Sequence, residues 1–239
     1  ALIFDAEWVI EAVIENIEVK RSTYQKIAEH RQESSIVSSN TSTIPLSTLV
    51  EGMDENLLPY FAITHFFNPP RHMRLVEVVP SDAMTQETTN KLVSILAHQL
   101  GKHAVVCRDT PGFLANRLGN FWSSVAADTA LKQGIDIETA DAILSRPFGI
   151  PRTGVFGLFD YVGIQLMPSV WDSLLKALPE DDTLQRFDIT KSSIVQHLLT
   201  NGLTGRTGPS GFYRGRKEVI DPEALEYRPL NDLTDPATK

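Results

Sequence analysis

The sequence "YFAITHFFNPPRHMRLVEVVP", from Tyr60 to Pro80, holds two apolar runs on either side of a turn-like segment with two prolines. Both runs are rich in β-branched and aromatic residues, which predicts strands at Tyr60–Phe67 and Arg74–Pro80. The first strand carries His65 and the second carries Glu77. Because successive strands usually lie side by side, the two polar side chains can meet.

Two interpretations of His65 and Glu77 follow from this placement. A histidine in an apolar strand is commonly a hydrogen-bonded structural group, and a glutamate is unremarkable if its face of the strand is exposed. A carboxylate next to an imidazole, however, fixes its tautomer and stabilises the imidazolium that forms when it takes a proton. The pair therefore indicates either a structural contact or a general base.

Short apolar runs alternate with helical patterns on both sides of this stretch. Further strands are predicted at Trp8–Ile14, Ser35–Ser39 and His103–Asp109, and helices at Asn16–His30 and Thr85–Leu100. Alternation of strands and helices favours an α/β sheet with helices packed on it.

The pattern changes after "DTPGF" (Asp109–Phe113). Helices are predicted at Leu114–Gln133 and near Glu138–Leu144, Gly157–Leu178 and Thr190–Thr200, with no convincing strand. We therefore expect an α/β domain over residues 1–109, an all-helical domain over 110–215, and a polar, proline-rich tail or connector over 216–239.

Composition narrows the classes of partner. Of 239 residues, 42% are hydrophobic and 22% charged, and the formal net charge is -8, which disfavours nucleic-acid binding through clustered cations. No apolar stretch approaches the length of a membrane span, so we expect no membrane partner. We also expect no bound metal. The single cysteine, Cys107, fits a reducing compartment. The N-terminal stretch is studded with acids and lacks a basic leader, so we expect no secretory signal.

Three further polar clusters have competing interpretations. "SSNTST" (Ser38–Thr43) follows a strand, where ligands bind in doubly wound sheets, yet such residues also make self-bonded turns. In "VIENIEVK", Glu15 and Lys20 are either ligand contacts or a helix-start acid and a solvated lysine. Asn116, after "DTPGF", is either a donor to a ligand or an ordinary helix-start amide.

The motifs together resemble those of the L-3-hydroxyacyl-CoA dehydrogenase family, in the same order and over nearly the whole chain. The segments that carry the resemblance are "VIEAVIENIEVK", "SSNTST", "HFFNPPRHMRLVEVV", "GKHAVVCRDTPGFLANRL" and "PFGIPRTGVFGLFDYVG". This family oxidises the 3-hydroxyl group of an acyl-CoA thioester with NAD in fatty acid β-oxidation. The resemblance implies a partial Rossmann-like, doubly wound sheet and an all-α C-terminal domain that supplies the acyl pocket and a dimer interface.

The resemblance also implies roles for single residues. His65 matches the catalytic base and Glu77 its partner, while Ser42 matches a serine near substrate and nicotinamide. Asn116 matches the amide that holds the substrate carbonyl region. The residues implied to line the NAD site are Glu15, Lys20, Ser42, Asn68 and, by a looser match with different spacing, Arg206.

One departure from the family is large. No G-x-G-x-x-G occurs in the chain, and the acid that would bind the adenosine ribose is absent with it. We therefore expect a chain that lacks the family's first strands, either because it is a fragment or because a further segment is absent from the printed sequence, and that is inactive when made alone. "VIDPEALEYRPLND" resembles the connector to an enoyl-CoA hydratase-like region in bacterial chains, so we expect such a region, fused or associated, and a bacterial cytoplasmic or other reducing location.

Two alternatives stay open at this point. One is a related NAD-dependent enzyme that acts on a hydroxy acid or sugar acid and needs no CoA. The other is a non-catalytic protein similar to λ-crystallin, which resembles the family but has a structural role.

Overall fold

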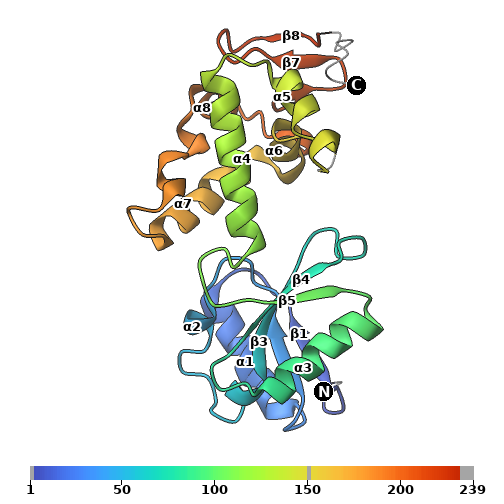
Figure 1. Ribbon diagram of the computed structural model, residues 1–239. Coiled ribbons are helices and arrows are strands. Elements are labelled where there is room, and N and C mark those ends of the chain that lie inside the picture. The colour runs from blue at the N-terminus through green and yellow to red at the C-terminus, as the bar shows by residue number, and fades with distance from the viewer. Residues whose placement is uncertain (1–2, 150–151, 232–239) are drawn as a thin grey trace. The chain divides into compact units, whose positions relative to one another are not determined.

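The chain forms two compact units, Ala1–Arg117 and Leu118–Lys239. The structure is a computed structural model that describes residues 3–149 and 152–231 (Figure 1). The division between the units falls inside helix α4 (Ala115–Lys132), later than the boundary after residue 109 that we expected from sequence. The first turn of this long helix therefore belongs with the α/β unit.

A five-stranded sheet forms the centre of the first unit, in the order β1-β2-β3-β4-β5. Strands β1, β2 and β3 run parallel, β4 runs antiparallel to β3, and β5 runs parallel to β4. The strands are β1 (Trp8–Glu11), β2 (Ile36–Ser39), β3 (Phe61–Phe66), β4 (Leu75–Pro80) and β5 (His103–Val106). The predicted α/β class is confirmed, and the Tyr60–Pro80 stretch is its antiparallel hairpin.

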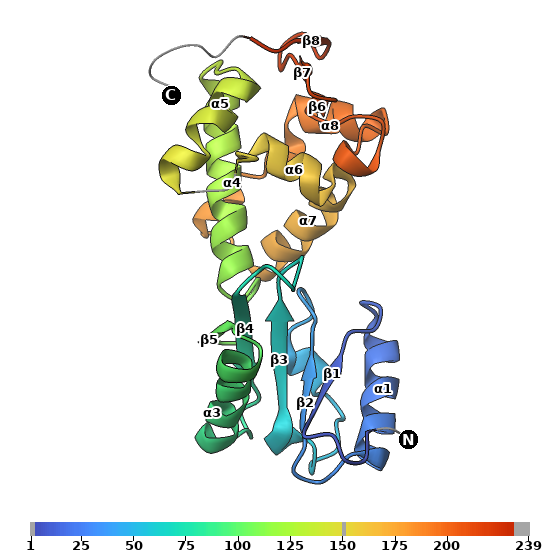
Figure 2. The same cartoon turned by 90° about the vertical axis from the view of Figure 1, so that its right-hand side faces the viewer.

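Helices cover both faces of this sheet, as Figure 2 shows. On one side lie α1 (Ile17–His30) and α2 (Leu46–Leu49), and on the other lies α3 (Gln86–Ser94), which continues as a π-helical turn, Ile95–Gln99. Side chains of a strand alternate between faces, so β3 supplies Phe61 and Ile63 to one core and Ala62 to the other. A single 3-10 turn, Leu58–Tyr60, leads into β3.

Local sequence explains where the elements of this unit begin. The Asn16 side chain accepts a hydrogen bond from the N–H of Val19 and so starts α1, and Thr85 does the same for α3. The Asp109 carboxylate accepts from the N–H groups of Leu46 and Ser47, which ties the segment after β5 to the start of α2.

The second unit is mainly helical. It contains most of α4, then α5 (Ile137–Ile143), α6 (Phe156–Val162), α7 (Met167–Ala177) and α8 (Ser193–Thr200). Short 3-10 turns lie between them, at Arg146–Phe148, Ile164–Leu166, Thr183–Arg186 and Ile189–Lys191, and another, Gly205–Thr207, follows α8. Gly163, at φ 107°, separates α6 from the following turns, so Gly157–Leu178 is not one helix as the pattern predicted.

The helical C-terminal domain is confirmed, but we expected no strand in it and only a tail from residue 216. The structure has a three-stranded antiparallel sheet there, made of β6 (Tyr213–Arg214), β7 (Glu218–Ile220) and β8 (Tyr227–Pro229). Val219 and Ile220 are fully buried in the same core as Phe156 and Trp171. These strands are too short for an alternating pattern to show in the sequence. Residues 232–239 of the expected tail lie outside the described residues.

Among the helices that the structure describes, none combines the length and the apolar character that crossing a bilayer requires.

Candidate functional site

His65 and Glu77 face each other directly across the β3–β4 hairpin. They are register partners in the antiparallel pair, and His65 Nδ1 lies 2.7 Å from Glu77 Oε2. Both side chains take the sheet face that also carries Ile63 and Val79, the face covered by α1 and α2. The side chain of Glu77 is fully buried and that of His65 is 7% exposed. The contact expected from sequence is therefore present, in a nearly dry setting.

The start of α4 holds the second oxygen of Glu77. Glu77 Oε1 accepts hydrogen bonds from the backbone N–H groups of Leu114 (2.8 Å) and Ala115 (2.7 Å). Burial disfavours the charged carboxylate, but the hydrogen bonds from His65, Ala115 and Leu114 outweigh it and hold the pKa of Glu77 below its usual value of 4.5. Glu77 is therefore ionised at neutral pH.

An ionised Glu77 fixes the chemistry of His65. A carboxylate only accepts, so Nδ1 of His65 must carry the proton it donates, and in the neutral ring Nε2 keeps its lone pair. The rings of Phe67 and Phe113 lie beside the imidazole, with centroids at 4.4 and 5.9 Å. This arrangement can accept a proton at Nε2 while Glu77 stabilises the resulting charge.

A second polar cluster lies where β1 ends. The carboxylate of Glu11 accepts from Lys20 Nζ at 2.9 Å, from the Tyr24 hydroxyl at 2.7 Å and from the Ser39 hydroxyl at 2.7 Å. The side chains of Glu11 and Lys20 are 0% and 1% exposed. Lys20 is therefore not the solvated lysine of the structural interpretation, but a buried cation held by a buried anion.

Glu15 links this buried pair to the "SSNTST" segment. Its Oε2 lies 3.1 Å from Lys20 Nζ, and its Oε1 accepts from the hydroxyls of Thr41 and Thr43 and from the Ser42 N–H. Burial works against its charge, but the bond from Thr41 and the nearby Lys20 cation prevail and lower its pKa. The carboxyl ends of β1 and β2, the usual ligand-binding edge of such a sheet, thus carry hydroxyl, carboxylate and ammonium groups together.

These groups fit one end of a dinucleotide. Glu15, which is 39% exposed on its side chain, and the half-buried Ser42 offer the acceptors and donors that ribose hydroxyls and a carboxamide need. The glycine-rich turn that would contact a pyrophosphate does not occur in the sequence. The residues present therefore suit a ribose or a carboxamide rather than a pyrophosphate.

The remaining predicted residues are distributed differently. Asn116 is half-buried in the first turn of α4, immediately after the two N–H groups that bind Glu77. Asn68 is exposed in the loop after β3. Arg206 belongs to the second unit, where its guanidinium lies 5.0 Å from the centre of the Tyr161 ring. In the described part of the chain, no group of three or more His, Cys, Asp or Glu side chains could hold a metal ion.

Sequence reasoning missed three side chains that organise the site. Glu11 anchors Lys20, Thr41 binds Glu15, and the Asn40 side-chain oxygen accepts from the Phe66 N–H and so joins the ends of β2 and β3. Glu11 had a signal, since it is an acid inside the apolar run "WVIEAVI", as Glu77 is inside "RLVEVVP". Asn40 and Thr41 had none, because turn segments commonly contain such residues.

Comparison with known proteins gives a consistent result. The family model described as "3-hydroxyacyl-CoA dehydrogenase, NAD binding domain" matches residues 1–110, and the model "3-hydroxyacyl-CoA dehydrogenase, C-terminal domain" matches residues 112–215. A solved structure of 3-hydroxybutyryl-CoA dehydrogenase from Escherichia coli superposes with a TM-score of 0.73 at 29% identity, over 89% of this chain and 43% of that one.

Two relatives illustrate how the chain relates to longer proteins. A putative fatty acid oxidation complex trifunctional enzyme of Rickettsia prowazekii is 40% identical over 97% of this chain, which spans 33% of that protein. A probable 3-hydroxyacyl-CoA dehydrogenase of Caenorhabditis elegans is 34% identical over 89% of this chain and 68% of that protein. The chain thus spans about a third of the length of the Rickettsia relative and two thirds of the other.

Proposed function

Since the chain belongs to the 3-hydroxyacyl-CoA dehydrogenase family, a family of NAD-dependent oxidoreductases, we propose that its complete protein oxidises (S)-3-hydroxyacyl-CoA to 3-oxoacyl-CoA. The observation that carries this proposal is the buried His65–Glu77 pair with its 2.7 Å hydrogen bond. Oxidation of an alcohol needs a base for the hydroxyl proton, and Nε2 of His65 is a base with a free lone pair.

In this proposal, each residue of the site has its own role in the reaction. His65 takes the proton of the substrate 3-hydroxyl at Nε2, and Glu77 stabilises the imidazolium through Nδ1–H. The two N–H groups of Leu114 and Ala115 keep Glu77 ionised and in place. When bound, NAD supplies the acceptor for the hydride that leaves C3. The reverse reaction uses the same groups, with His65 returning the proton.

Other residues would orient substrate and cofactor. We assign Ser42 to the substrate hydroxyl and nicotinamide, and Asn116 to the substrate carbonyl, because Ser42 lies at the ligand-binding edge of the sheet and Asn116 in the α4 turn that holds Glu77. Glu15, Lys20 and Asn68 are assigned to the nicotinamide end of NAD. Arg206 is supported only by the loose sequence match, because its unit is separate from the one that holds His65.

Assembly and location are part of this proposal. The first unit would be the remaining NAD-binding domain and the helical unit the acyl pocket and homodimer interface. The names of the Rickettsia trifunctional relative and of a fatty acid oxidation complex subunit from Psychrobacter cryohalolentis support a partner region such as an enoyl-CoA hydratase. A bacterial cytoplasmic location is supported by the bacterial relatives. Light scattering coupled to size exclusion measures the oligomeric state.

The decisive experiment is an NADH oxidation assay on the complete gene product, with acetoacetyl-CoA and free acetoacetate as alternative oxidants. We expect turnover of the CoA ester and much slower turnover of the free acid. Preference for the free acid would support a hydroxy-acid dehydrogenase instead, and turnover of neither would support a non-catalytic protein.

A further inference from the structure

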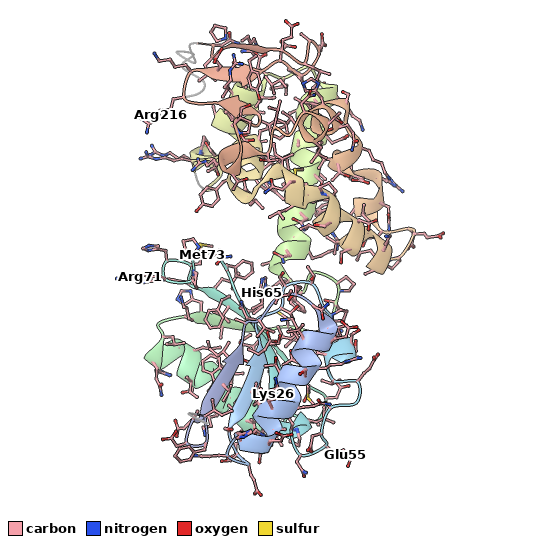
Figure 3. All side chains as sticks on the ribbon, turned by 180° about the vertical axis from the view of Figure 1, so that it is seen from behind. Lys26, Glu55, His65, Arg71, Met73 and Arg216 are labelled. Atoms are coloured by element: carbon pink, nitrogen blue, oxygen red, sulfur yellow. The ribbon has the colours of Figure 1, made fainter. Side chains whose placement is uncertain are left out.

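The loop between β3 and β4 carries a cluster of exposed basic side chains that the proposed chemistry does not use. Arg71, His72 and Arg74 lie in it, and all are exposed. Lys102 and His103 lie next to it at the start of β5, where the His103 N–H binds the Arg74 carbonyl. We call these five residues the loop patch. Figure 3 shows Arg71 on this loop, at the end of the sheet where His65 lies.

The loop patch is strongly positive within an acidic chain. The net charge of the chain is -8, yet the segments 66–75 and 95–106 contain no Asp or Glu at all. In the part of the chain that the structure describes, the side chains of Arg71, His72 and Arg74 have no hydrogen-bond or ion-pair partner. Three permanent or near-permanent cations, Arg71, Arg74 and Lys102, are thus left without a compensating anion.

Lys102 gives the loop a fixed shape. Its ammonium group donates to the backbone carbonyl of Pro70 and, at 2.8 Å, to that of Met73. The two carbonyls lie on either side of Arg71 and His72 in the chain. Lys102, which directly precedes β5, therefore fixes both ends of this turn. A cationic loop that is already ordered loses less conformational entropy when it binds a ligand.

The position of the loop patch separates it from the polar cluster of Glu15, Lys20 and Ser42. The strand order β1-β2-β3-β4-β5 places Glu15, Lys20 and Ser42 at the ends of β1 and β2, on one side of β3. The loop patch lies on the other side, where β4 and β5 begin. His65, near the end of β3, stands between the two.

We propose that the loop patch binds the phosphate groups of the coenzyme A part of the substrate. This inference rests on the proposed function. Arginine presents donors in a planar fork that suits phosphate, and those of Arg71 and Arg74 bind no group among the described residues. A thioester held at His65 carries its phosphates at the far end of a long flexible arm, and a fixed cationic loop beside β4 can hold that end. Met73, 41% exposed, adds an apolar surface for the arm or the adenine.

The test compares two thioesters that differ only in the nucleotide part. Acetoacetyl-CoA carries the phosphates and the adenosine, and acetoacetyl-pantetheine carries neither. In the complete protein, the double variant Arg71→Gln, Arg74→Gln should raise KM for acetoacetyl-CoA about 10-fold, since bonds to charged groups are the stronger class. It should leave kcat and the kcat/KM for acetoacetyl-pantetheine within about 2-fold, because this binding is remote from the reacting atoms. The salt dependence of KM should also weaken.

A matched control removes two cations elsewhere in the same unit. Lys26→Gln with Lys91→Gln changes the net charge equally, on the exposed surfaces of α1 and α3, and should leave KM for both thioesters unchanged. The KM for NADH separates the two sources of phosphate, because a rise there would assign the loop patch to the cofactor and overturn the proposal.

Two other outcomes would also overturn it: an unchanged KM for acetoacetyl-CoA, or an equal loss with both thioesters. If the unaltered protein turns over neither thioester, the proposed function fails by itself. Calorimetric titration with free CoA then still tests the loop patch, since the double variant should lose heat of binding and the Lys26, Lys91 control should not.

Discussion

At His65, the hydrogen bond to Glu77 determines which ring nitrogen is available for chemistry. Because Nδ1 is engaged at 2.7 Å, only Nε2 can accept a proton. We expect His65→Gln in the complete protein to lower kcat by about 10²–10⁴, the usual effect of losing a positioned base. Steady-state NADH oxidation measures it, with circular dichroism as a control for folding. Near-normal turnover would reduce His65 to a structural residue.

We also predict that Glu77 contributes to the free energy of unfolding in a way that depends on pH. Its pKa is lowered in the folded protein, so its charged form stabilises the fold above the usual pKa of 4.5, and this contribution is lost as the pH falls through the lower folded-state value. We expect the difference in unfolding free energy between the unaltered protein and Glu77→Gln to be largest near pH 7 and to shrink below pH 4.5. Urea titrations at several pH values measure it. A constant difference would contradict an ionised, hydrogen-bonded Glu77.

Lys20 is the most buried cation of the site and its removal leaves Glu11 charged without a counter-ion. Breaking a buried ion pair from one side costs about 3–5 kcal/mol, so Lys20→Met should lower the unfolding free energy by that order. Lys26→Met on the exposed face of the same helix is the matched control and should change it by less than about 0.5 kcal/mol. Equal effects of the two substitutions would mean that the Glu11–Lys20 pair contributes nothing specific.

At the scale of secondary structure, the turn before α4 sets the direction of the two backbone N–H groups that bind Glu77. Gly112 has φ 72° and Phe113 φ 47°, a left-handed path that directs the next two N–H groups to Glu77. Gly112→Ala should cost about 1–2 kcal/mol of stability and also lower kcat. Gly52→Ala provides the control, since Gly52 has φ 71° with open space around it, and should cost stability but leave kcat unchanged. If both variants keep full kcat, the turn does not position Glu77.

Strand-level patterns in the sequence predicted much of this site, for a physical reason. Apolar runs placed His65 and Glu77 on strands, and a short connection made the two strands neighbours, so the contact between the two side chains could be expected. The backbone donors of Leu114 and Ala115 could not be predicted, because N–H groups look the same in every sequence and their aim depends on tertiary packing. The short sheet β6–β8 was missed since strands of two or three residues have no period to detect.

For the molecule as a whole, each unit has its own core. The first packs Phe61 and Ile63 under α1 and α2, and the second packs Phe156, Trp171 and Val219. Among the described residues, the buried side chains of each of these two clusters come from one unit. The Arg228 side chain ties β8 to α5, because its guanidinium contacts both Asp136 and Glu138.

The cofactor prediction also belongs to this scale. The 239 residues contain no G-x-G-x-x-G, and the residues that we propose for the cofactor, Glu15, Lys20, Ser42 and Asn68, account for only one end of NAD. We expect this chain made alone to bind NAD weakly and to show little activity, while the complete gene product under the same conditions binds and turns over. Calorimetry and the NADH assay measure both. Tight NAD binding by the isolated chain would mean that another backbone segment holds the pyrophosphate.

The edge of the sheet gives a related expectation. Among the described strands, β1 pairs with β2 alone, and Ile10 on β1 is 43% exposed. An open strand edge with apolar side chains favours pairing with another chain. We expect concentration-dependent association of the isolated chain in light scattering, and a strictly monomeric chain at high concentration would contradict this.

The register of the β3–β4 hairpin allows substrate preference to change while the proton chemistry of the site stays the same. His65 and Glu77 are fixed opposite each other by the strand ladder, whereas the residues of the connecting loop take no part in that ladder. Variation in loop length or charge can therefore alter which ester is preferred while the proton chemistry stays constant. A library of loops between Asn68 and Leu75, selected on different thioesters, would sample new specificities on one unchanged acid–base pair, and the hairpin is in this sense a modular unit for evolution.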